Sequence, residues 1–258
     1  MSEPEQEMVK RRRGIYLLPN LFTTAALFFG FYAVVAATTD RFELAALAIF
    51  VAMVLDGMDG RVARLTNTQS DFGVQYDSIA DMVSFGVAPA LVMFEWALKG
   101  MELLGPTWGK IGWIGAFMYT ACAGLRLARF NTQVGVVDKR YFQGLPSPAA
   151  AAVVAGLVWV GDDLNFRGLP VELVAWVLTV TPAILMVSNI RYYSFKEFDF
   201  RYRVPFMAIV ILVLAVAFAS IHPPTVLFLV FLAYMVSGPV LTVWRLREAK
   251  RNRRDSSV

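Results

Sequence analysis

The chain reads Asp56-Gly57-Met58-Asp59-Gly60-Arg61-Val62-Ala63-Arg64, and after eight intervening residues it continues Gly73-Val74-Gln75-Tyr76-Asp77-Ser78-Ile79-Ala80-Asp81. Four carboxylates therefore fall within two segments whose neighbours are strongly apolar. An ionised side chain near the middle of a bilayer costs roughly 2.5 to 3.5 kcal/mol on insertion scales, so these acids need cations or water to face. The stretch indicates a membrane protein that is built around a polar centre.

Apolar segments on both sides of this stretch indicate an all-α, polytopic helical bundle. The chain has 258 residues and is 57% hydrophobic, and its apolar runs are long enough to cross a hydrocarbon core of about 30 Å. We expect eight transmembrane helices, at 15–37, 43–65, 73–98, 111–130, 147–162, 170–190, 204–221 and 224–244. No Gly/Ser/Pro-rich linker divides the chain, so we expect a single integral-membrane domain over 1–258, with tails at 1–14 and 246–258.

The basic residues predict the orientation of this bundle. With eight spans both termini share one side, and that side holds 20 of the 24 Lys and Arg residues, all except Arg41, Lys99, Lys110 and Arg167. This bias predicts that the termini and the acidic stretch face the cytoplasm, in a bacterial-type inner membrane. The net charge of +4 follows from this topology. No basic patch is interleaved with stacking aromatics, so we expect no nucleic-acid partner.

Helical spacing brings the four aspartates together. Asp56 and Asp59 lie about 60° apart around one helix, and Asp77 and Asp81 are spaced i, i+4 on the next. Carboxylates without His or Cys suit hard cations such as Mg²⁺ or Mn²⁺, and four of them are enough to bridge two ions. Arg64 would repel a passing cation and suits a phosphate oxygen instead. The pattern thus favours a phosphoryl-transfer site over a cation pathway or a network of salt bridges.

The small residues beside the acids, Gly60, Ala63 and Gly73, have two interpretations. Small side chains let membrane helices pack closely against one another. They also leave room for a nucleotide or a phosphate against the backbone. Their spacing alone does not decide between the two.

The acidic stretch resembles the signature of the CDP-alcohol phosphatidyltransferases. Every position of the pattern D-x2-D-G-x2-A-R-x8-G-x3-D-x3-D is filled, by Asp56, Asp59, Gly60, Ala63, Arg64, Gly73, Asp77 and Asp81. The resemblance implies a homodimer of six-helix cores with a cavity that faces the cytoplasm, to which spans seven and eight would be additions. It also implies that the four aspartates bind two divalent ions and that Asp81 is the general base. Arg64 would contact the diphosphate of CDP-diacylglycerol, and Gly60, Ala63 and Gly73 would admit its cytidine.

Four further segments resemble the phosphatidylserine synthase branch of this family. They are Leu18-Pro19-Asn20-Leu21-Phe22-Thr23, Ser84-Phe85-Gly86-Val87-Ala88-Pro89, Arg126-Leu127-Ala128-Arg129-Phe130-Asn131 and Phe142-Gln143-Gly144-Leu145-Pro146-Ser147-Pro148. The resemblance implies L-serine as the acceptor and CMP as the leaving group. Another acceptor, such as glycerol phosphate or inositol phosphate, is the alternative within the class. A divalent-cation transporter is the alternative outside it.

Three polar residues near the end of the fourth span are candidate substrate ligands. Arg126 and Arg129 either extend to the membrane interface or capture an anion, which would be the carboxylate of serine or the diphosphate. Asn131 would add a hydrogen bond to serine or ribose.

Two other features have local interpretations. Ser147-Pro148 is typical of a helix start, with Ser as N-cap and Pro at the first helical position. Tyr192 and Tyr193 lie on a connection that either covers the cavity or contributes to an interfacial aromatic belt.

Overall fold

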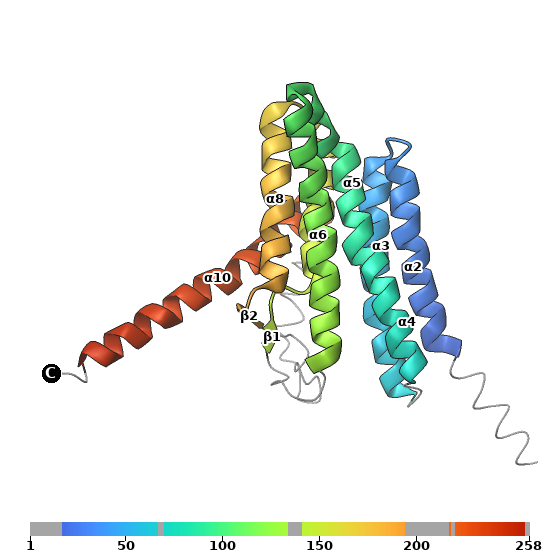
Figure 1. Ribbon diagram of the computed structural model, residues 1–258. Helices are drawn as coiled ribbons and strands as arrows, with labels where there is room; N and C mark the ends of the chain where they lie inside the picture. The colour runs from blue at the N-terminus through green and yellow to red at the C-terminus, as the bar shows by residue number, and fades with distance from the viewer. Residues whose placement is uncertain (1–16, 67–69, 134–140, 194–216, 218–219, 256–258) are drawn as a thin grey trace, which may run out of the picture.

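The computed structural model describes residues 17–66, 70–133, 141–193, 217 and 220–255, and most of these residues are helical (Figure 1). In chain order the helices are α2 (Leu17–Ala37), α3 (Phe42–Leu65), α4 (Asp71–Asp81), η1 (Met82–Val87), α5 (Ala88–Trp96), η2 (Leu98–Leu104), α6 (Pro106–Gln133), α7 (Ser147–Asp163), α8 (Leu169–Val187) and α10 (Pro223–Asp255). Strands β1 (Tyr141–Gln143) and β2 (Arg191–Tyr193) pair antiparallel, with Phe142 opposite Tyr192. The all-α bundle is confirmed, and this short ribbon was not predicted.

Five helical segments of the described chain are long and apolar enough to cross a membrane: Pro19–Ala37, Asp71–Trp96, Pro106–Thr132, Leu169–Val187 and Pro223–Arg245. Two more predicted spans coincide with α3, which carries the acids, and with α7, which has only 17 residues. The predicted span at 204–221 lies outside the described residues, apart from 217, 220 and 221. Helix α10 continues to Asp255, so most of the predicted C-terminal tail is helical. The protein is an integral membrane protein.

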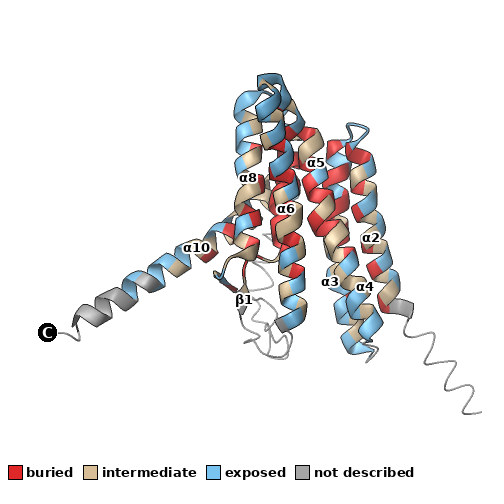
Figure 2. Ribbon diagram, viewed as in Figure 1, coloured by how far each residue is buried: buried red, intermediate tan, exposed pale blue. Residues whose placement is uncertain are grey.

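Helix α7 is the centre of the bundle. Fourteen of its 17 residues are buried, and it contacts α3, α5, α8 and α10. Its alanines and glycines allow close approach of neighbouring backbones. At Gly156, for example, an added Cβ would lie 3.1 Å from the Cα of Phe228 on α10. Buried residues gather between the other helices as well, whereas α10 is exposed along much of its length (Figure 2).

The third span changes helix type immediately after Asp81. Met82–Val87 form a π-helical segment, and Pro89 follows in the first turn of α5. Pro89 has no N–H to donate to the carbonyl four residues earlier, that of Phe85. Tyr119 of α6 donates its hydroxyl to this carbonyl instead, at 3.1 Å. A side chain from another helix thus satisfies a backbone group that lipid could not satisfy.

A second tyrosine hydroxyl that donates to a carbonyl left free by a proline joins β2 to α10. Pro239 lies inside α10 and cannot donate to the carbonyl of Met235. The hydroxyl of Tyr192 donates to this carbonyl at 3.0 Å, and the tyrosine ring packs on Gly238, where an added Cβ would collide with it. Tyr192 is only 1% exposed, so the interfacial-belt interpretation is wrong for this residue. Tyr192 instead fastens α10 to the bundle.

We expect Tyr192→Phe to destabilise the protein by about 1 to 3 kcal/mol, because it leaves the buried carbonyl of Met235 without a donor. The measurement is the thermal unfolding midpoint of the purified protein in detergent. Tyr32→Phe is the matched control, since Tyr32 stacks on Phe28 of α2, far along the chain from this contact. Equal midpoints for Tyr192→Phe and the unchanged protein would contradict the role given to the hydroxyl.

Candidate active site

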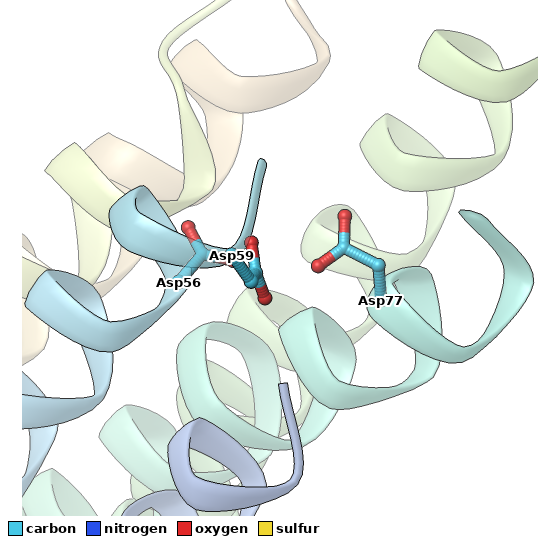
Figure 3. A group of neighbouring side chains, drawn as sticks. All are labelled: Asp56, Asp59 and Asp77. Atoms are coloured by element: carbon cyan, nitrogen blue, oxygen red, sulfur yellow. The ribbon is translucent and has the colours of Figure 1, made fainter. Parts of the chain in front are cut away.

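Three of the four aspartates form a cluster between α3 and α4. Side-chain oxygens of Asp56, Asp59 and Asp77 all lie within 4.8 Å of one another. Asp77 on α4 faces the two acids of α3 across the gap between these helices (Figure 3). Asp59 is buried, while Asp56 and Asp77 are partly exposed. Such a cluster could hold a metal ion while remaining open to a ligand.

Asp81 lies one turn beyond Asp77, beside the cluster. It interacts electrostatically with Asp56, Asp77 and Arg126. Its Oδ1 atom is buried and has no hydrogen-bond partner among the described residues. Carboxylates this close repel one another unless protons or cations lie between them. The donor set is carboxylate oxygen throughout, so the residues present fit a hard divalent cation.

Thr23 of α2 supports the cluster from behind. Its hydroxyl donates to Asp59 Oδ2 at 2.8 Å, and Thr23 is 4% exposed. One residue further, the hydroxyl of Thr24 lies 2.9 Å from that of Tyr76 and links α2 to α4. Thr23 is thus a positioning residue for a candidate metal ligand. The sequence placed Thr23 in a segment that resembles the serine branch but gave it no role, since only the packing of α2 on α3 brings it to Asp59.

Of the three small residues, only Gly60 lies on an open face of the site. An added Cβ at Gly60 would meet no atom of the described residues within 4 Å, and Gly60 is exposed, as is Arg64 one turn later. Ala63 is partly buried. At Gly73 an added Cβ would lie 3.2 Å from the hydroxyl oxygen of Ser70, which caps α4. The space at Gly60 favours room for a ligand over helix packing.

Arg126 of α6 turns inward beside the acids. Its guanidinium donates to Ser147 Oγ at 2.6 Å and interacts electrostatically with Asp81. Ser147 is the first residue of α7, but Pro146 occupies the N-cap position and no side chain caps the helix. The predicted N-cap role of Ser147 is therefore wrong, because its buried hydroxyl instead accepts a hydrogen bond from Arg126.

Arg129 and Asn131 make different contacts. Arg129 donates to the carbonyls of Met186 and Ser188, at 3.1 and 3.3 Å, and so caps the C-terminal end of α8. Asn131 donates from Nδ2 to the hydroxyl of Ser78 at 3.0 Å, which places it against α4. The structure therefore brings Arg126 to Asp81 and Asn131 to Ser78 of α4, while Arg129 engages the end of α8.

This geometry defines a class: a polytopic membrane protein with a carboxylate cluster suited to hard cations, an arginine that interacts with one of the acids, and open space at Gly60. The family model for CDP-alcohol phosphatidyltransferase matches residues 16–190, which include every residue of the site described above. The chain belongs to the CDP-alcohol phosphatidyltransferase family.

Several curated relatives carry the same name, CDP-diacylglycerol–serine O-phosphatidyltransferase. The protein of Helicobacter pylori is 39% identical over 183 residues, which cover 71% of this chain and 74% of the relative. That of Mycobacterium tuberculosis is 33% identical over 240 residues, covering 88% and 79%. That of Saccharomyces cerevisiae is 36% identical over 166 residues, covering 55% and 54%. Similarity thus extends across bacteria and yeast.

We expect Thr23→Val to weaken the binding of Mn²⁺ by about 10-fold or more, because a lost hydrogen bond to a ligating carboxylate typically costs this much affinity. Titration calorimetry of the purified protein with Mn²⁺ measures this affinity directly. Thr38→Val is the matched control, since Thr38 is exposed at the other end of α2 and bonds only locally, to the carbonyl of Val35. Unchanged affinity in Thr23→Val would remove Thr23 from the site.

Proposed function

We propose that this protein transfers the phosphatidyl group of CDP-diacylglycerol to the hydroxyl of L-serine, which forms phosphatidylserine and releases CMP. The observation that carries the proposal is the cluster of Asp56, Asp59 and Asp77 within 4.8 Å, inside the segment that matches the family. The names of the relatives support serine as the acceptor.

We assign the metal site to the four acids of the motif, which would hold two divalent ions, Mg²⁺ or Mn²⁺: Asp56, Asp59, Asp77 and Asp81. When bound, such ions neutralise charge on the diphosphate and on the departing CMP. Arg64 would contact the diphosphate from the exposed end of α3. The open face at Gly60, with Ala63 and Gly73, would receive the cytidine, as the free space at Gly60 supports.

Asp81 is our candidate for the general base. A serine hydroxyl is a poor nucleophile at neutral pH, so a carboxylate within reach must accept its proton as it attacks the phosphorus in line with the leaving CMP. The buried Oδ1 of Asp81, which has no hydrogen-bond partner in the described part of the chain, is available for this proton.

On the acceptor side we place Arg126 in direct contact with the carboxylate of serine, because its guanidinium interacts electrostatically with Asp81. Asn131, which bonds to Ser78 next to Asp77, would add a neutral hydrogen bond to serine or ribose. Arg129 would support the site indirectly, since its donors are engaged by the carbonyls at the end of α8.

We further propose one domain over 1–258 that forms a homodimer in a bacterial-type cytoplasmic membrane. The site and both termini would face the cytoplasm, and the acyl chains of the donor would enter sideways from the bilayer. The distribution of basic residues supports this orientation.

The decisive experiment measures CMP release by purified protein with CDP-diacylglycerol, Mg²⁺ or Mn²⁺, and one candidate alcohol at a time. We expect L-serine to stimulate release strongly and excess chelator to abolish it. Release that depends on glycerol phosphate or inositol phosphate, but not on serine, would refute the acceptor. Movement of divalent ions into protein-containing liposomes without CMP release would support a transporter instead.

We expect Asp81→Asn to lower the rate of CMP release by at least 100-fold, within the range that general acid–base catalysis contributes. Binding of CDP-diacylglycerol should largely survive, because the other three acids and the face at Gly60 remain. Turnover under saturating serine gives the first quantity, and equilibrium binding of labelled donor gives the second. A near-normal rate would show that another group takes the proton.

A further inference from the structure

The segment 84–89 resembles the serine branch, but the proposed chemistry gives it no role. Its residues belong to the π-helical turn Met82–Val87 and to the start of α5, and most of them are buried. Turns of this kind are rare, and they occur frequently at functional sites. This one begins directly after Asp81, the candidate general base.

The π-helical turn determines which face of α4 points towards α3. In a π-helix each N–H bonds to the carbonyl five residues earlier, and here the N–H of Ala88 donates to the carbonyl of Val83. The turn therefore holds one more residue than an α-helix would, which rotates the helix before it by about 100° relative to the helix after it. Helix α5, after the turn, packs against α2, α3, α6 and α7. With α5 held in place, the turn sets the direction of Asp77 and Asp81.

Two hydrogen bonds fasten this turn to neighbouring helices. The hydroxyl of Tyr119 on α6 donates to the carbonyl of Phe85 at 3.1 Å, and Tyr119 is fully buried. The hydroxyl of Ser84 donates to the carbonyl of Ala26 on α2, also at 3.1 Å. An added Cβ at Gly30 of α2 would lie 2.8 Å from the Cα of Ser84, so the two backbones are in close contact. The turn is thus held from both sides.

Helix α6 contacts the third span both before and after Asp81. Three residues before it, the hydroxyl of Ser78 accepts Nδ2 of Asn131 at 3.0 Å. Four residues after it, the carbonyl of Phe85 accepts the hydroxyl of Tyr119. The Oδ1 atom of Asp81 is buried and has no hydrogen-bond partner in the described part of the chain. The place of this atom therefore depends on the backbone that α6 holds on either side.

We propose that Tyr119 is a positioning residue for Asp81: its hydroxyl holds the π-helical turn that directs the carboxylate of Asp81 towards the other three acids. This rests on the proposed function, which makes Asp81 the base and a metal ligand. The segment 84–89 then has a role, since its residues shape the turn and do not need to contact a substrate.

The first test compares Tyr119→Phe with Tyr192→Phe. Each change removes a buried hydroxyl that donates to a helix carbonyl freed by a proline, at 3.1 and 3.0 Å, but the hydroxyl of Tyr192 donates to α10. We expect both changes to lower the thermal unfolding midpoint. Only Tyr119→Phe should lower kcat for CMP release, by about 10- to 100-fold, because a small misplacement of a reacting group is costly. The KM for L-serine should change less than about 2-fold, as for a contact that matters only in the transition state.

A double-mutant cycle tests whether the effect passes through Asp81. In the Asp81→Asn background, Tyr119→Phe should lower the residual rate by less than about 2-fold, because the group that Tyr119 positions is already lost. A full further loss in this background, or equal kcat values for Tyr119→Phe and Tyr192→Phe, would overturn the proposal. Ser84→Ala loosens the same turn from the side of α2 and should also lower kcat. If Tyr119→Phe does not fold, an unchanged kcat in Ser84→Ala overturns the proposal.

Binding of Mn²⁺ gives a measurement that needs no turnover. Because Asp81 would be a metal ligand, Tyr119→Phe should weaken Mn²⁺ binding by about 10-fold, within the range for groups that hold a ligand in place. Tyr192→Phe should leave this affinity unchanged. Equal affinities in the two variants would overturn the proposal while leaving the proposed function intact. If the unchanged protein releases no CMP with L-serine, the proposed function itself fails, and the calorimetry still tests the turn.

Discussion

The rest of the structure depends on the mutual repulsion of four carboxylates that two neighbouring helices hold close together. Helices α3 and α4 bring Asp56, Asp59 and Asp77 within 4.8 Å, with Asp81 one turn further. Such an arrangement is stable only with positive charge nearby, because ionised groups at membrane depth are costly and like charges oppose one another. Arg126 supplies one positive charge beside these acids, and the geometry of the carboxylates suits a hard cation that would supply more. The same four aspartates therefore lower the stability of the bundle and would bind the metal ions and substrates.

Much of this could be predicted from the sequence, because it depends on local geometry. Spacing along a helix places Asp56 beside Asp59, and long apolar runs indicate the spans regardless of how they pack. Contacts between helices were not predictable in the same way. The bond from Thr23 to Asp59 depends on how α2 rotates against α3, and the turn of Ser147 towards Arg126 depends on where α7 begins relative to α6. A single sequence does not indicate how two helices rotate or shift against each other.

Arg126 and Arg129 illustrate the limit most clearly. Three residues apart, they share one side of α6, and the sequence offered no reason to separate them. Their Cα positions are nevertheless displaced by about 4.5 Å along the helix and about 60° around it. That displacement is enough for Arg126 to meet the acids while Arg129 reaches the carbonyls of Met186 and Ser188. Arg129 differs from Arg126 because the carbonyls at the end of α8 lie within its reach, and no sequence pattern around residue 126 indicates where α8 ends.

The two proline–tyrosine pairs have a consequence for how this chain can change over evolutionary time. Pro89 and Pro239 each free a carbonyl that a tyrosine from another element then fills. A replacement of Pro239 by a residue with an N–H would restore the bond within the helix, and the carbonyl of Met235, which has two lone pairs, could still accept the hydroxyl of Tyr192. Replacing the tyrosine alone strands the carbonyl. The dependence therefore runs in one direction: among relatives that possess a helix equivalent to α10, a proline at the position of Pro239 should be accompanied by a hydroxyl donor at the position of Tyr192, 47 residues earlier.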